Sequence, residues 1–208
     1  MPSELDDNLQ RFIEAQPVFF VATAPLDAQG HVNLSPKGLN SFRVLGPKTV
    51  AYLDLIGSGV ETIAHLKENG RIVLMFYAFQ EPPKTVRLHG HGRVVEPHDP
   101  EFSALALHFP AYDSVRAIIV VELTRVAQSC GYGVPILTYQ RDRSQHFGWT
   151  RKKGAEGLQA YQQEKNSRSI DGLPGVRLPE VKLPGVTGQS TENSSPTIFE
   201  SSKTEKLA

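Results

Sequence analysis

The clearest chemical signal in the sequence is a glycine-flanked serine, Ser58, that precedes an expected helix. Glu61 follows it three residues later, which is the capping-box pattern of a helix N-terminus. In that interpretation both side chains bind backbone N–H groups and no ligand is needed. In the alternative, the same helix end binds a phosphate, because unpaired N–H groups lie there and Gly59 lets an anion approach. The spacing alone favours the cap, since no Walker lysine follows.

A second candidate is the run Ser35-Pro36-Lys37-Gly38, which closes an expected strand. Lys37 is either a solvated lysine at a strand end, which is the usual case, or the cation that a phosphate group requires. Gly38 has no side chain, so a flat ring could lie against the backbone at this position. The residues themselves leave both interpretations open.

Other reactive side chains lie in weaker patterns. His89 and His91 share one face of an expected strand, but no third metal ligand is evident, which favours a half-exposed strand face. Cys130 lies beside glycines and has no obvious activating base, so a buried or idle thiol is favoured over a nucleophile. We find neither a serine–histidine–aspartate elbow nor a paired-carboxylate motif.

The composition narrows the class of protein. The 208 residues include 22 lysines and arginines and 22 aspartates and glutamates, a balance that does not suggest binding to nucleic acid or to a charged membrane. A single cysteine excludes an internal disulfide and fits a reducing compartment. The N-terminus is acidic and polar, unlike a signal peptide, and no apolar run approaches the roughly 20 residues of a membrane span. We therefore expect a cytoplasmic protein.

Hydrophobic periodicity and turn residues predict the elements that position these side chains. The expected helices cover residues 3–16, with Ser3 as the cap, 58–68, 99–110 and 148–166, the last weakened by Gly154 and Gly157. The expected strands cover residues 18–24, 32–38, 48–55, 71–79, 84–97 and 115–131. The strands that begin at residues 71 and 115 look apolar on both faces, which favours a homodimer that buries part of them.

These elements predict a mainly β fold of the α+β class. Short turns join most of the strands, whereas a parallel sheet needs a helix after nearly every strand. A small closed or split β-barrel with flanking helices fits better. We expect one domain, residues 1–177, that includes the C-terminal helix. Residues 178–208 are rich in Ser, Thr, Pro and Gly without a sustained period, so we expect a disordered tail.

The order of segments resembles the pyridoxamine 5′-phosphate oxidase-like family over residues 3–135. The stretches that carry the likeness are PVFFVATAPLDAQGHVNLSPKG, TVAYLDL, GRIVLMFYAF and TVRLHGHGRVVEP. SPKG, GSGVETIAHLKENGRIVLMF and SCGYGVP are most similar to a poorly characterised branch. The resemblance implies an FMN-binding split β-barrel, usually a homodimer that holds FMN at the subunit interface.

The resemblance also implies cofactor contacts, some of which this chain alters. The arginine-led stretch along the flavin ring corresponds here to residues 35–38, where the arginine is missing. The tyrosine–threonine strand end that helps to hold the phosphate corresponds to Leu53 and Asp54. The serine–arginine–lysine run before the helix corresponds to residues 58–62, with Glu61 and Thr62 where cations are expected.

One arginine of the family pattern is kept. A glutamine–valine–arginine strand corresponds to Thr85-Val86-Arg87. If the helix that begins at Ser58 also faces a phosphate, Lys37, Arg87 and backbone N–H groups must supply the missing positive charge. The candidate cofactor-binding residues are therefore Ser35, Pro36, Lys37, Gly38, Leu53, Asp54, Ser58, Gly59, Thr62, Thr85 and Arg87.

Two functional hypotheses follow from the resemblance. The first is a homodimeric FMN-binding protein that acts as a flavin-dependent oxidoreductase on an unknown substrate, with no catalytic residue assigned. The alternative is a non-catalytic split barrel that binds another planar ligand, a deazaflavin or haem, or none, and Glu61 with the lost cations favours it. The arginine- and tryptophan-bearing C-terminal segment of the true oxidases has no match here, which argues against vitamin B6 oxidation. A third, weaker hypothesis is that the protein is a scaffold and that its C-terminal tail carries the function.

Overall fold

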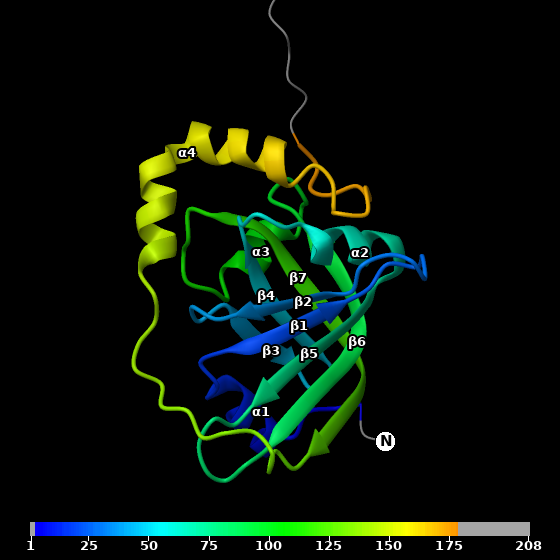
Figure 1. Cartoon of the computed structure of the whole chain (residues 1–208), viewed down its shortest axis with the longest axis vertical. Helices are drawn as coiled ribbons and strands as arrows, with labels where there is room; N and C mark the ends of the chain where they lie inside the picture. The colour runs from blue at the N-terminus through cyan, green and yellow to red at the C-terminus, as the bar shows by residue number, and fades with distance from the viewer. Residues whose placement is uncertain (1–2, 179–208) are drawn as a thin grey trace, which may run out of the picture. The chain divides into compact units, whose positions relative to one another are not determined.

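The structure, a computed structural model, describes residues 3–178, in which seven strands form one antiparallel sheet accompanied by four helices (Figure 1). The strands are β1 Phe19–Thr23, β2 Asn33–Lys37, β3 Phe42–Gly46, β4 Thr49–Leu55, β5 Arg71–Tyr77, β6 Thr85–Val95 and β7 Val115–Ser129. The helices are α1 Asp7–Glu14, α2 Glu61–Asn69, α3 Phe102–Ala106 and α4 Gln145–Lys165. None of these helices is long and apolar enough to cross a membrane.

The sheet curls until its two edges approach each other. The strand order is β2-β1-β5-β6-β7-β4-β3, so β2 and β3 are the edge strands. Lys37 on β2 nevertheless binds Asp54 on β4, with 2.7 Å between Nζ and Oδ1. An ion pair therefore spans the gap between strands from opposite ends of the sheet. The predicted mainly β split barrel with flanking helices is confirmed.

Most of the predicted elements are present, with corrections at their ends. The N-terminal helix begins later than expected, and Asp6 rather than Ser3 caps it, because Asp6 Oδ1 accepts a hydrogen bond of 2.8 Å from the Leu9 N–H. Strand β3 was not predicted. It is a short edge strand that pairs only with β4, and most of its side chains are half-buried, so its sequence shows no clear alternation.

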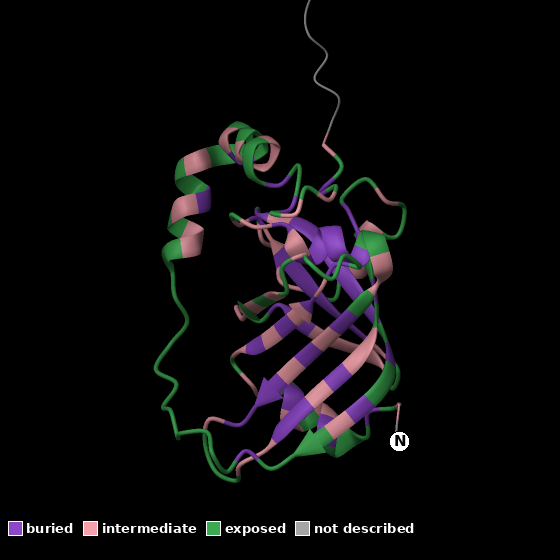
Figure 2. Cartoon of the chain, turned by 45° about the vertical axis from the view of Figure 1, so that its right-hand side comes forward, coloured by how far each residue is buried: buried purple, intermediate pink, exposed green. Residues whose placement is uncertain are grey.

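The two strands predicted to be apolar on both faces differ in how far they are buried in this protomer. Residues 116–121 of β7 are buried on both faces, because α3 and the segment after it cover the outer side with Phe102 and Phe109. On β5 the burial alternates instead, and Val73 and Met75 on the outer face are only half-buried (Figure 2). The outer face of β5 is therefore apolar but not fully buried within this protomer, and the predicted homodimer that covers it stays a prediction.

After β7 the chain leaves the sheet and returns to it. Residues 131–144, which we call the arm, have almost no regular structure and lead to α4 (Figure 1). The expected weakness of this helix is present at Gly154, where φ is 64° and two helical pieces meet. Two contacts attach this part of the chain to the barrel, one in the middle of the arm and one just beyond its end. The Leu137 N–H donates to the Phe79 carbonyl at 2.9 Å, and Ser114 Oγ lies 2.8 Å from His146 Nε2.

Residues 166–178, which we call the clasp, attach the chain to α2 and to the loop after β6. Lys67 Nζ on α2 donates to the Gly175 carbonyl at 2.5 Å and to Glu96 Oε1 at 3.1 Å. Arg177 binds the carboxylates of Glu96 and Asp99. The disorder predicted for residues 178–208 concerns residues that lie, apart from Leu178, outside the described part of the chain, so it stays a prediction.

Candidate cofactor site

Helix α2 does not begin as the sequence suggested. Val60 occupies the N-cap position with φ −132° and ψ 12°, the first helical residue is Glu61, and no side chain caps the helix. Ser58 is exposed and lies two residues before that position, so the predicted Ser58–Glu61 capping box is wrong. The Glu61 carboxylate folds back instead, since a Cβ on Gly59 would lie 2.3 Å from Glu61 Oε2. A side chain at position 59 would therefore displace the Glu61 carboxylate.

The clasp borders the start of α2. The buried Asn166 donates from Nδ2 to the Gly57 carbonyl at 2.9 Å, and the Ile170 N–H donates to Glu61 Oε1 at 3.3 Å. Glu61, which stands where the family resemblance expects a cation, thus holds the chain's own backbone. These contacts place protein groups where the phosphate was expected, and the cofactor role of Ser58 and Gly59 stays a prediction.

Ser35 and Thr62 belong to a chain of polar side chains that joins β2, β1 and α2. Ser35 Oγ donates to Asn33 Oδ1 at 2.9 Å, and Asn33 Nδ2 donates to Thr62 Oγ1 at 3.0 Å. Asn33 also reaches Thr23, whose Oγ1 lies 3.0 Å from Nδ1 of the buried His65. Burial lowers the pKa of His65, so the imidazole is neutral at neutral pH. The Thr62 hydroxyl therefore accepts an internal hydrogen bond inside the barrel.

Lys37 and Asp54 form a charged cluster with a third residue, Arg116 on β7. Asp54 is fully buried and receives Lys37 Nζ on one carboxylate oxygen and Arg116 Nε on the other, each at 2.7 Å. Burial by itself raises the pKa of Asp54, but the Arg116 and Lys37 charges outweigh it and lower the pKa to about 2. Two cations share one carboxylate, so the cluster carries a net positive charge.

The sequence reasoning missed Arg116. The sequence feature that could have revealed it is an arginine inside the apolar run VRAIIVVEL. In a strand that is buried on both faces, no water can solvate a charge at this position. A buried arginine needs a carboxylate partner. Asp54, at the end of another apolar strand, was the matching acid.

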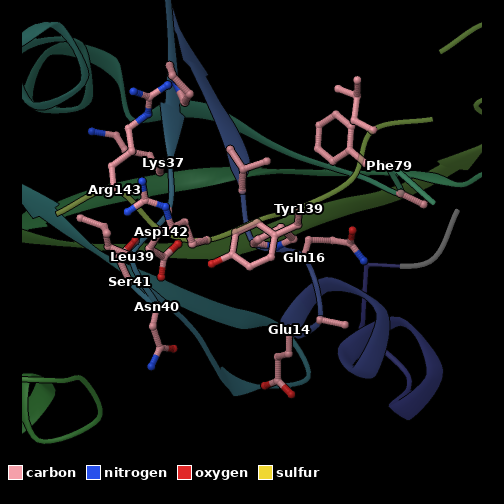
Figure 3. A pocket seen from close by; sticks show the side chains of 18 of the residues that line it. Glu14, Gln16, Lys37, Leu39, Asn40, Ser41, Phe79, Tyr139, Asp142 and Arg143 are labelled. Carbon is pink, nitrogen blue, oxygen red and sulfur yellow. The ribbon is translucent and has the colours of Figure 1, made fainter. Parts of the chain in front are cut away.

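A cleft of about 1370 Å³ lies between the barrel and the arm (Figure 3). Its walls are the end of α1, the loop after β2, the β5–β6 hairpin and residues 137–146. Four of the predicted cofactor residues line it, namely Pro36, Lys37, Gly38 and Leu53. Asp54 lies directly behind Lys37. Among residues 3–178, the remaining six, Ser35, Ser58, Gly59, Thr62, Thr85 and Arg87, do not contribute to its lining.

Arg87 lies on β6 and binds Ser129 Oγ on β7 at 3.1 Å. Thr85 is buried on the same strand, opposite Tyr77. The structure therefore does not bring Arg87 to the cleft, and the cation that shares Asp54 with Lys37 is Arg116, behind the cleft wall. A cofactor role for Thr85 and Arg87 stays a prediction.

The loop after β2 is held in an unusual conformation on the cleft wall. Leu39 (φ 61°) and Asn40 (φ 54°) both lie in the left-handed region, which non-glycine residues seldom adopt. Tyr112 donates from its hydroxyl to the Leu39 carbonyl at 2.5 Å, and Arg43 Nη1 donates to Asn40 Oδ1 at 2.8 Å. Contacts from two other segments thus fix this loop, so it presents a preformed wall.

The cleft combines aromatic surface with charge of both signs. Phe12, Phe79 and Tyr139 line it, and Lys84 Nζ lies 4.8 Å from the centroid of the Phe12 ring. The cationic lining residues are Lys37, Lys84, Arg141 and Arg143, and the acidic ones are Glu14, Glu81 and Asp142. Since Arg116 offsets Asp54 behind the wall, the site has a small positive excess. A planar, anionic ligand suits these walls.

Comparison with known proteins identifies the family. The family described as pyridoxamine 5'-phosphate oxidase matches residues 5–130. The chain belongs to this family. It is 41% identical over 191 residues to the pyridoxamine 5'-phosphate oxidase family protein ustO of Aspergillus flavus, a match that covers 83% of this chain and 76% of that protein. The predicted family resemblance is confirmed.

Solved structures give more distant likenesses. The H111A variant of HupZ from Group A Streptococcus is 22% identical, with a TM-score of 0.49 over 60% of this chain and 98% of that one. An FMN-binding protein from Syntrophomonas wolfei is 16% identical, with a TM-score of 0.42 over 59% of this chain and 87% of that one. At these levels of similarity the likenesses carry no argument about what this chain binds.

The family match ends where the arm begins, at residue 130. Cys130 itself is exposed, so its thiol is not buried, and the expectation of an idle thiol stays a prediction. The arm, α4 and the clasp therefore add to the matched barrel, and the arm supplies one wall of the cleft.

Proposed function

We propose that this family member binds FMN in the cleft beside Lys37. The supporting observation is that Pro36, Lys37, Gly38 and Leu53, which the sequence predicts as cofactor contacts, line one side of a single large cleft. Its volume of about 1370 Å³ is larger than the pockets of roughly 300–1000 Å³ that bind most small ligands. It therefore has room for a three-ring cofactor and a second molecule.

The residues on the cleft wall fit the cofactor's chemistry. The Lys37 side chain is 18% exposed, and its ammonium has three donors, so it can bind a phosphate and keep its contact with Asp54. Arg116 remains behind it as a second positive charge. Glu61 does not line this cleft, and its carboxylate accepts a hydrogen bond from the backbone of the clasp. Glu61, which favoured a different ligand or none, therefore has a structural role within the chain.

The expected activity is that of an oxidoreductase with an unidentified substrate. A bound flavin supplies the redox chemistry, and the protein contributes binding, orientation and charge. Gly38 and Leu53 offer a flat wall for the ring, and Lys37 offers charge for the phosphate. His146 also lines the cleft, and burial lowers its pKa, so it can accept a proton at neutral pH.

We further propose a homodimer that covers the outer face of β1, β2 and β5. Phe20 lies opposite Met75, and Ala22 lies opposite both Val73 and Leu34. These side chains form a continuous apolar surface, on which Leu34 is 65% exposed. Surfaces of this kind mark protein interfaces more often than free solvent-facing sheets.

Titration with FMN tests the cofactor assignment. We expect stoichiometric binding at micromolar protein, measured by the change in flavin fluorescence. Lys37→Ala should weaken FMN binding by about 1–3 kcal/mol, because it removes a charge-assisted contact, and should leave riboflavin, which has no phosphate, unaffected. Lys48→Ala is the control, since Lys48 pairs with Glu4 on the surface. Unchanged fluorescence with both flavins would contradict the proposal.

A further inference from the structure

The arm brings its own charged side chains to the cleft. Tyr139, Asp142 and Arg143 all line it, although they lie beyond the residues that the family matches. Figure 3 shows Arg143 and Asp142 on the same side of the cleft as Lys37, Leu39 and Ser41, whereas Phe79 lies on the opposite side. A positive group from the arm is thus placed beside the positive cluster of the barrel.

Arg143, like its neighbour Arg141, forms no ion pair within residues 3–178, whereas Lys37 is paired with Asp54. The neighbouring Asp142 interacts with Tyr139 instead, and its hydrogen bond is the main cause that raises the pKa of the Tyr139 hydroxyl. The Arg143 guanidinium therefore has donors available for a ligand.

The arm is attached to the barrel close to Arg143. His146, three residues further on, contacts Ser114 Oγ at 2.8 Å, and the Phe147 ring packs on Tyr112 with centroids 5.5 Å apart. Tyr112 also donates to the Leu39 carbonyl, on the same side of the cleft as Arg143. The same anchor thus fixes the arm and the loop after β2, so Arg143 is presented to the cleft at a limited range of distances from Lys37.

We infer that Arg143 and Lys37 together form a subsite for a phosphoryl group, one cation from the arm and the other from the barrel. A guanidinium binds two phosphate oxygens at once, and an ammonium adds a point charge from the other side. This inference rests on the proposed function in so far as the phosphoryl group is that of FMN. A phosphoryl group bound by both residues links the arm to the barrel, so the arm slows the release of the ligand.

The decisive measurement is the rate of flavin release from the full chain. We expect Arg143→Gln to release FMN about 10- to 100-fold faster, with riboflavin release unchanged. Arg151→Gln on α4 is the matched control, because Arg151 is exposed and does not line the cleft. Asp142→Asn should slow FMN release, since it removes a negative charge beside the phosphate. Equal effects of Arg143→Gln on both flavins, or no effect on either, would overturn the inference.

A second probe keeps the inference testable if neither flavin binds, which would refute the proposed function alone. Trp149 is the single tryptophan, and its ring centroid lies 5.9 Å from that of His146 on the cleft wall. Inorganic pyrophosphate should change its fluorescence in the unaltered chain and in Arg151→Gln, but not in Arg143→Gln. No response in the unaltered chain would then overturn the inference.

Competition identifies the source of the phosphoryl group when flavin does bind. Pyrophosphate that displaces FMN but not riboflavin places the FMN phosphate in the subsite. Pyrophosphate that binds alongside FMN, and is lost in Arg143→Gln, assigns the subsite to the phosphate of a second ligand. Wild-type protein that holds riboflavin as tightly as FMN and does not respond to pyrophosphate would contradict both sources.

Discussion

Two neighbouring cations keep the buried carboxylate of Asp54 ionised. A fully buried carboxylate without partners would be protonated, whereas Arg116 and Lys37 each bind one of its oxygens at 2.7 Å. Lys37 therefore has two roles, because it faces the cleft and also stabilises a buried charge in the core. Substitution of Lys37 consequently affects both ligand binding and folding, because Asp54 then has one partner in place of two.

The Asp54 cluster predicts a loss of stability in acid. Its pKa is lowered from 3.8 to about 2, so the carboxylate stabilises the fold above pH 4 and this contribution is lost as the pH falls toward 2. Urea unfolding at pH 7, 4 and 3 should show about 1 kcal/mol of this decline by pH 3, and the full loss of about 2 kcal/mol is reached only below pH 2. The pKa of Glu96 is also lowered, so Glu96 contributes to the loss of stability in acid as well. Asp54→Asn removes the Asp54 contribution, so this variant should lose less stability between pH 7 and pH 3. An equal loss in the variant and in the unaltered chain would contradict the prediction.

Helix caps give a prediction at the scale of the element. Ser58 is exposed and caps nothing, so Ser58→Ala should change the free energy of unfolding by less than about 0.5 kcal/mol. Asp6 accepts a hydrogen bond from the Leu9 N–H at the start of α1, so Asp6→Ala should cost about 1 kcal/mol. Both are measured by urea denaturation. A larger loss for Ser58→Ala than for Asp6→Ala would show that α2 is capped after all.

The clasp depends on one buried acid. Glu96 is 1% exposed and binds Lys67 and Arg177, and these hydrogen bonds outweigh burial and lower its pKa. Glu96→Gln should loosen the clasp, because Lys67 loses its charged partner and Arg177 keeps only the more exposed Asp99. The Gly175 and Val176 amides should then exchange with deuterium at least about tenfold faster, as expected for local opening. Asp99→Asn, which alters the more exposed partner of Arg177, should change them less.

At the scale of the whole molecule, the outer face of β5 tests the proposed assembly. Met75→Lys places a charge on the apolar surface, opposite Phe20, and should convert a dimer into a monomer, as measured by light scattering. Ser103→Lys, on the exposed side of α3, is the control and should leave the mass unchanged. A monomeric mass for the unaltered chain would refute the homodimer.

The sequence by itself determined the mainly β fold, its family and six of the seven strands. Strands and helices follow from side-chain periodicity and turn residues, which are local properties of the chain. The stretch TVAYLDL therefore predicted β4, and Gly154 predicted the break in α4. The start of α2 was misjudged, because Ser58 and Glu61 fit a local pattern that the contact of Glu61 with Ile170 overrides.

Only the tertiary structure decided which residues meet at the cleft. Lys37 and Asp54 are 17 residues apart in the chain, and Asp54 and Arg116 are 62 apart, so no local pattern joins them. The curl of the sheet brings them together, and it leaves Arg87 on β6 away from the site. The arm then adds Arg143 from a segment without periodicity. Binding partners of this kind are fixed by chain topology and packing, which a linear sequence does not display.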